Sequence, residues 1–279
     1  MFVTRRSLLV AAPAGWLWPA TGAAMTGAQA PATATAPAIP AATGAARAVS
    51  DSFPAHDPAL ARDMVGASHG NVARVRELLT AHPTLALATW DWGYGDWETA
   101  LGAASHVGNR EIAELLLTNG AHPTIFSAAM LGQLDVVKAF VAARPGIQKT
   151  RGPHGLSLLI HAKAGGPGAA PVVTYLESLG DADPRYPNEP LDAAELANLT
   201  GEYAFGDAPN EKFVVTTPAR GGLMLKREGM FDRPLWHHGG RVFNPAGAEA
   251  VRIRFEPPTG RASAVTVEDG SLRLTARRG

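Results

Sequence analysis

The chain has 279 residues, and its 25 Lys and Arg residues balance 25 Asp and Glu residues, so its formal net charge is zero. That balance lacks the basic excess expected of a nucleic-acid-binding protein. The sequence contains no cysteine, which excludes disulfides, thiolate metal ligands and cysteine nucleophiles. We therefore expect a chain stabilised by packing, without a nucleic-acid partner.

Residues 1–30 have the pattern of an export signal: Arg5 and Arg6 precede an apolar run, and small residues suited to cleavage follow. Thr4-Arg5-Arg6-Ser7-Leu8-Leu9 resembles the twin-arginine pattern, with an ordinary secretory signal as the alternative. A retained anchor is disfavoured because the run is shorter than the ~18 residues of a membrane-spanning helix and contains two prolines. We predict a periplasmic or secreted protein whose mature chain, cut between Ala23 and Ala30, has no membrane span.

Residues 31–50 consist mainly of Ala, Pro, Thr and Gly and show no periodic apolar face. Such a segment cannot recover the entropy lost on ordering, so we predict a flexible linker.

A helix-turn-helix pattern then recurs between residues 51 and 186. Each copy has apolar residues at three- and four-residue spacing, which makes one helical stripe. One helix pair cannot bury this stripe alone, so neighbouring copies must stack. The predicted core positions are Val75, Leu79, Ile112, Leu116, Val137, Val141, Val173 and Leu176.

These segments resemble ankyrin repeats. Residues 98–104 are similar to the opening turn and first helix of that family, and residues 119–123 and 180–184 to its closing loop. The resemblance implies about four degenerate repeats that bind a protein partner, usually on the concave face formed by the short first helices. The alternative is a generic array of helical hairpins.

After Pro190 the periodicity changes from helical to alternating. Residues 191–199 suit a short helix, and eight short runs separated by Gly, Pro, Asn or Asp indicate antiparallel strands between residues 202 and 276. Residues 191–279 therefore predict a small closed barrel or sandwich. The Leu196-x-x-Leu199-x-Gly201-x-Tyr203 motif resembles the small lipocalin-like β-domain appended to bacterial β-lactamase-related hydrolases, where that domain is an accessory. The predicted fold class is thus a multidomain α + β chain: an α-helical ankyrin solenoid followed by an antiparallel β-domain.

The usual motifs for catalysis and cofactor binding are mostly missing. The chain has no Ser-x-x-Lys, His-Glu-x-x-His or phosphate-binding glycine motif, so we expect no catalytic, cofactor-binding or metal-ligating residues. His69 and His106 lie beside helix-ending glycines, where a histidine commonly bonds to local backbone. His237 and His238 are adjacent on an expected strand and point to opposite faces, which disfavours a shared metal. Asp181 and Asp183 belong to the ankyrin-like closing loop and lack the further ligands that calcium needs.

One group of aromatic residues favours binding to a protein partner. Trp90, Trp92 and Tyr94 alternate with other residues, so in an extended finger they would share a face, and Trp97 follows just before the next helix. Because Trp and Tyr dominate interface hot spots, we interpret these four residues as a candidate partner-binding surface. The alternative is that the rings fold back onto the repeats and extend their core.

The sequence therefore predicts an exported, non-enzymatic ankyrin-repeat module that binds a protein of unknown identity. A small-ligand carrier that uses the barrel interior is the main alternative, and an unrecognised hydrolase is the third. A wide interior lined by small residues would favour the carrier. An interior filled by Phe205, Phe213, Leu225, Phe255 and Val267 would favour a scaffold.

Overall fold

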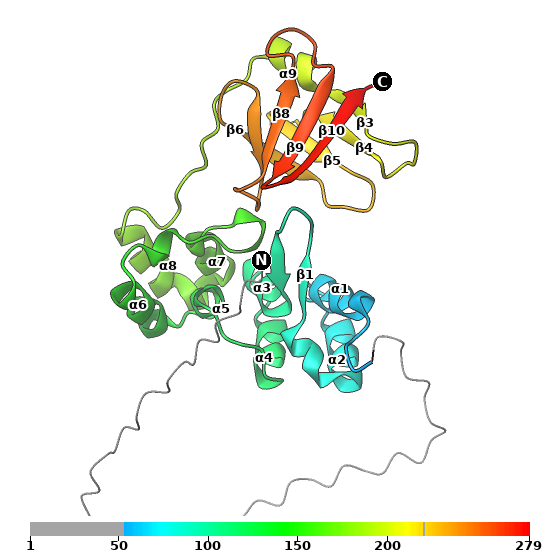
Figure 1. The fold of residues 1–279 in the computed structure, drawn as a ribbon. Helices are drawn as coiled ribbons and strands as arrows, with labels where there is room; N and C mark the ends of the chain where they lie inside the picture. Colours follow the sequence, from blue (N-terminus) through cyan, green and yellow to red (C-terminus); the bar gives the residue numbers. More distant parts are fainter. Residues whose placement is uncertain (1–52, 220) are drawn as a thin grey trace, which may run out of the picture. The chain divides into compact units, whose positions relative to one another are not determined.

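The computed structural model describes residues 53–219 and 221–279, which form a helical region followed by a β-barrel (Figure 1). The export signal and the linker predicted for residues 1–50 lie outside the described residues. Among the helices that are described, none has the length and apolar character needed to cross a bilayer.

The helical region contains four consecutive helix pairs, and the four predicted stripes fall in the second helix of each pair. Short 3₁₀ helices lie in the connections: η1 (Pro83–Leu87), η2 (Ile147–Lys149), η3 (Pro153–Gly155) and η4 (Gly166–Ala169). The pairs are α1 (Pro58–Ala67) with α2 (Val72–Ala81), α3 (Ala100–His106) with α4 (Arg110–Thr118), α5 (Ile125–Met130) with α6 (Leu134–Ala143), and α7 (Leu158–Ala164) with α8 (Ala170–Ser178).

The Gly-Asn pairs between helices explain why each second helix starts where it does. Asn71 and Asn109 cap α2 and α4, accepting backbone N–H bonds from Arg74 at 3.0 Å and Ile112 at 3.1 Å. Gly108 adopts φ +76°, and a Cβ there would lie 2.1 Å from the carbonyl oxygen of Ala164. A glycine is thus required both by the turn and by the close approach of the end of α7.

Two apolar clusters form the core of the helical region, one in the first two helix pairs and one in the last two. Leu116 and Val137, two of the predicted core positions, are fully buried. The prediction is wrong for Val141 and Val173, which are only partly buried. In α8 the residue that is turned into the core is Val172.

An inserted hairpin separates the first two helix pairs. Strand β1 (Thr89–Asp91) pairs antiparallel with β2 (Trp97–Thr99), and Trp90 lies opposite Glu98. Backbone N–H of Ala100 donates to the carbonyl of Ala88 at 2.9 Å, so α3 begins directly where the hairpin ends. This bond holds the hairpin, residues 89–99, against the start of α3.

The C-terminal region is a closed, eight-stranded antiparallel barrel, and a short helix, α9 (Ala193–Leu199), precedes it. The predicted fold class, helical repeats followed by an antiparallel β-domain, is confirmed. Each strand pairs with its neighbour in the chain, and β10 closes the ring onto β3. The strands are β3 (Gly201–Ala204), β4 (Lys212–Thr216), β5 (Leu223–Lys226), β6 (Arg233–His237), β7 (Val242–Pro245), β8 (Arg252–Glu256), β9 (Ala264–Asp269) and β10 (Leu272–Arg278).

Large apolar side chains fill the barrel interior. Alternate residues of each strand point inward, and four of the five residues expected to fill the interior are buried in one cluster, while Phe205 packs against its edge. The buried four are Phe213, Leu225, Phe255 and Val267. This packing favours the scaffold over the small-ligand carrier.

Candidate functional site

The four aromatic residues of the hairpin do not share one face. Strand β1 ends at Asp91, and Gly93 and Tyr94 both have positive φ, so the extended alternation assumed for Trp90, Trp92 and Tyr94 stops halfway. The side chain of Trp92 is buried in the repeat core, whereas Trp97 is 62% exposed. The single-face geometry was therefore wrong, while a partner-binding role for the four residues stays a prediction.

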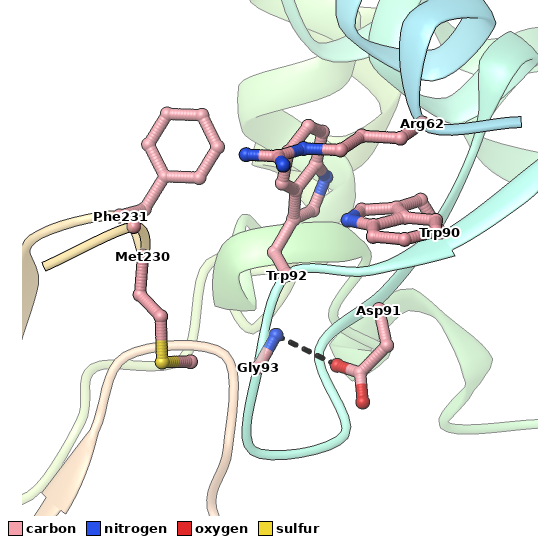
Figure 2. Close-up of a pocket in the computed structure, with 8 residues that line it drawn as sticks. Arg62, Trp90, Asp91, Trp92, Gly93, Met230 and Phe231 are labelled. Carbon is pink, nitrogen blue, oxygen red and sulfur yellow. Dashed lines mark hydrogen bonds between the residues drawn. The ribbon is translucent and has the colours of Figure 1, made fainter. Parts of the chain in front are cut away.

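Trp90 and Trp92 line a pocket of about 420 Å³, which Figure 2 shows. Arg62, on α1, places its guanidinium 5.9 Å from the ring centroid of Trp90. Phe231, from the loop between β5 and β6, meets Trp92 edge to face at 4.7 Å. The turn below them is held by the backbone N–H of Gly93, which donates to the Asp91 carboxylate at 2.8 Å.

Beside this pocket, Glu98 is surrounded by three histidines. Its carboxylate is fully buried, and the Nε2 atoms of His69, His106 and His154 lie 3.4, 2.9 and 3.4 Å from its oxygens. The nearest ring nitrogens of His69 and His106 are 3.2 Å apart. One candidate ligand atom from each of the four residues lies within 4.8 Å of all the others. We call these residues the histidine cluster; imidazole and carboxylate are ligand types that can hold a metal ion.

Polar contacts around the cluster fix the orientation of its side chains. The Nδ1 of His69 lies 3.1 Å from the Val65 carbonyl, and the Nδ1 of His154 lies 2.7 Å from the Asp96 carboxylate. Trp92 donates from Nε1 to Oε2 of Glu98 at 2.6 Å. The buried Trp92 side chain therefore belongs to the hairpin pocket and to the histidine cluster at once.

Asp96 is a buried anchor beside the cluster. Its carboxylate accepts bonds from the backbone and the ring of His154, at 2.8 and 2.7 Å, and from the guanidinium of Arg233 in β6. Although burial alone would raise the pKa of Asp96, these bonds hold it below its usual value. The residue stays ionised and keeps the His154 ring in place.

Burial and polar contacts also act in opposite directions on the pKa values of the residues in the histidine cluster. Burial would raise the pKa of Glu98, but the adjacent imidazoles of His106 and His154 lower it to about 2. Burial would lower the pKa of His154, but its bond to Asp96 and the nearby carboxylate of Glu98 raise its pKa to about 9. Nearby His161 shows the opposite balance, since burial lowers its pKa to about 4. Glu98 is therefore ionised, and its negative charge favours positive charge on the neighbouring histidines.

Sequence reasoning placed His69 and His106 in separate, local roles and did not single out Glu98 or His154. The local backbone bond holds for His69 but is wrong for His106, whose Nε2 contacts Glu98 and His69 instead. Stacking of the repeats brings these residues together from far apart in the chain. A usable signal was present, because Ala67-Ser68-His69 and Ala104-Ser105-His106 occupy the same place in successive repeats.

The remaining candidates examined in the sequence have structural partners. His237 lies 3.0 Å from the Glu189 carbonyl and His238 lies 2.6 Å from the Asn244 side chain, so the two rings bond in different places. Asp181 accepts a bond from Gln148 and pairs with Lys149 at 3.0 Å. These residues stabilise local structure.

Comparison with known protein families identifies one ankyrin repeat among the four that were predicted. Residues 96–127 match the ankyrin repeat family, a stretch that includes Glu98, α3, α4 and the start of α5. No curated protein matches the chain. Among solved structures the chain is similar to the crystal structures of SurE and of SurE with D-Leu, each at 25% identity and a TM-score of 0.25. Each match covers 43% of this chain and 28% of the SurE chain.

Proposed function

We propose that this protein is a non-enzymatic protein-interaction module that is exported to the periplasm. The ankyrin repeat at residues 96–127 supports this proposal, because repeats of this type suggest protein binding. Its binding surface is the pocket formed by Arg62, Trp90, Trp92 and Phe231, together with the exposed Trp97 ring. The pocket is the observation that carries the proposal.

The pocket combines aromatic walls with one cation, Arg62, and one carboxylate, Asp91, which accepts the backbone N–H of Gly93. Phe231 is 55% exposed although it is a large apolar residue, which is the expected state of an anchor that a partner covers. Asp63, the carboxylate next to Arg62 in the chain, pairs with Arg74. A protein segment with an apolar side chain next to an acidic residue would fill the pocket and pair with the guanidinium.

The other two functions have less support. A carrier needs an open barrel interior, and large side chains occupy that space here. A hydrolase of the kind that usually accompanies a lipocalin-like domain needs a nucleophile motif that the sequence lacks.

The test is capture of partners from a periplasmic extract with the mature chain carrying Arg62→Glu or Phe231→Ala. We expect both variants to lose the partner that the wild type retains. The matched control is Leu272→Ala, which removes another exposed apolar side chain, 71% accessible, from β10. Partners that the control and both variants retain equally would contradict the pocket as the binding surface.

The export route is tested separately. Replacing Arg5 and Arg6 by lysine should block a twin-arginine route and leave an ordinary secretory route intact. Cell fractionation would then detect the precursor in the cytoplasm. Normal export of the double variant would exclude the twin-arginine route, and a wild-type chain found only in the cytoplasm would exclude export.

A further inference from the structure

We propose that His69, His106, His154 and Glu98 bind a divalent transition-metal ion, with zinc the best match to the ligand set. This inference is independent of the protein-binding function proposed above. It rests on the position of the four ligand atoms, on the atoms that orient them, and on a buried oxygen that has no hydrogen bond.

The ligand atoms come from four separate places in the fold. His69 lies in the turn after α1, Glu98 in β2, His106 at the end of α3 and His154 in η3. A tetrahedral zinc site with bonds of ~2.0–2.1 Å has edges of about 3.3 Å between ligand atoms. The distances from Oε1 of Glu98 to Nε2 of His106 and His154 are 2.9 and 3.4 Å, and the Nε2 atoms of His106 and His69 are 3.2 Å apart, all near that edge. One ligand atom from each of the four residues lies within 4.8 Å of the others.

Two of the histidines are oriented as metal ligands usually are. The Nδ1 atoms of His69 and His154 face a backbone carbonyl and the Asp96 carboxylate, acceptors that place the proton on Nδ1. Their Nε2 atoms then face Glu98, and a metal ion bound there would take the place of the proton that a charged ring carries on Nε2. Histidine bonded through Nδ1 to a carboxylate or carbonyl is the common outer arrangement of a zinc site.

Glu98 supplies the strongest argument. Its Oε2 accepts the indole N–H of Trp92, but its Oε1 is buried and receives no hydrogen bond of acceptable geometry, although ring nitrogens lie 2.9 and 3.4 Å away. A buried carboxylate oxygen without a hydrogen-bond donor is costly. A cation between Oε1 and the three rings would satisfy this oxygen and would also separate the facing nitrogens of His69 and His106.

The ligand set selects the metal. Three imidazoles and one carboxylate suit zinc, whereas calcium and magnesium prefer oxygen ligands. An entry path exists, because His69, His106 and His154 border a pocket of about 630 Å³ that is also lined by Trp92 and Phe231. The side chains of His69 and His154 are 29% and 26% exposed. An ion can therefore reach the site without unfolding the repeats.

The competing interpretation is a network held by protons alone, in which Glu98 pairs with protonated histidines. The experiment that separates the two uses the mature chain, stripped with a chelator and titrated with ZnCl₂ against a chromophoric competitor. CoCl₂ is the spectroscopic probe, since cobalt in a tetrahedral nitrogen and oxygen site gives intense visible bands. We expect one ion per chain.

The variants test each kind of contact. His69→Ala should weaken zinc binding more than about 100-fold and abolish the cobalt bands, because it removes a ligand. The side chain of His69 is partly exposed, so we expect this variant to fold. Asp96→Asn, a positioning variant, should weaken binding about 10- to 100-fold. His122→Ala, which removes an exposed histidine outside the cluster, should bind as the wild type does.

Circular dichroism confirms that each variant is folded. The proposal is overturned if the folded wild type binds no zinc, or if His69→Ala and Glu98→Gln bind zinc as tightly as His122→Ala does. The second variant keeps the side-chain volume of Glu98 and removes its charge, so it tests the carboxylate directly.

Discussion

At the scale of single residues, Trp92 connects the two features of the hairpin. Its ring packs in the repeat core at 8% exposure, and its N–H orients the carboxylate of Glu98. Trp97, five residues along the chain, is mostly exposed and opposite Asp91 in the hairpin register. The two tryptophans of this hairpin thus have different roles: Trp92 stabilises the fold, and Trp97 forms part of the exposed surface.

Single substitutions should separate these roles. Trp92→Ala should lower the free energy of unfolding by about 3–5 kcal/mol, because it empties a buried site and leaves Glu98 without its donor. Trp97→Ala should change it by no more than about 0.5 kcal/mol. Urea denaturation of both variants is the measurement. Equal effects would mean that the hairpin packs differently from the structure.

The ion pair of Glu195 and Arg241 should make the stability of the barrel depend on pH. Glu195, in α9, accepts bonds from Nε and Nη2 of the buried Arg241 at 2.6 and 2.8 Å, and these bonds hold its pKa below the usual value. Because the folded pKa is the lower one, the pair stabilises the barrel above the unfolded pKa of about 4.3. That contribution is lost as the pH falls through the folded pKa.

Glu195→Gln should therefore destabilise the chain by about 1–3 kcal/mol near neutral pH, the usual range for a hydrogen bond to a charged group. The difference between wild type and variant should shrink toward zero in acid. Urea denaturation at about pH 7 and below about pH 4 measures both values. A difference independent of pH would show that the charge of Glu195 is not involved.

At the scale of elements, local periodicity was enough to predict the helix stripes and all eight strands. The alternation of Phe213 and Val215 in β4, or of Ile253 and Phe255 in β8, is a property of a few neighbouring residues. The histidine cluster was not predictable in this way. Its members lie between residues 69 and 154, and only the stacking of α1, α3 and the loop before α7 brings them together.

The hairpin also has a geometry that local periodicity did not predict. Alternation of Trp90, Trp92 and Tyr94 suggested one aromatic face, but the positive φ of Gly93 and Tyr94 is a turn that alternation cannot reveal. The Tyr94 ring packs against the barrel cluster instead. Which rings are exposed depends on tertiary contacts, and the sequence alone left that question open.

The stacking of helix pairs predicts the cost of removing a shared side chain. Leu116, in α4, is fully buried in the cluster that the first two helix pairs share. Leu116→Ala should cost about 2–5 kcal/mol in unfolding free energy, because the cavity cannot fully collapse between helices held from both sides. Val136→Ala in α6, at a 42% exposed position, is the control and should cost no more than about 0.5 kcal/mol. Similar losses in both would show that the stripe is not the core.

At the scale of the whole molecule, Arg233 joins the barrel to the hairpin. Its guanidinium donates to the Asp96 carboxylate, to the Ala246 carbonyl at 3.0 Å and to the Trp92 carbonyl at 3.2 Å. Both partners of the ion pair are buried, with side-chain exposures of 5% and 2%. Because Asp96 also positions His154, a strand of the barrel supports the histidine cluster of the repeats.

Arg233→Met should therefore destabilise the chain by about 3–5 kcal/mol, since it leaves the Asp96 carboxylate buried without its cation. The control is Arg254→Met, which breaks a surface pair with Glu268 and should cost at most about 1 kcal/mol. Urea denaturation gives the energies, and hydrogen exchange locates the effect. In Arg233→Met, exchange should accelerate in residues 89–99 as well as in β6, whereas Arg254→Met should leave the hairpin unchanged. Acceleration confined to the barrel would mean that the repeats hold the hairpin and the histidine cluster without help from Arg233.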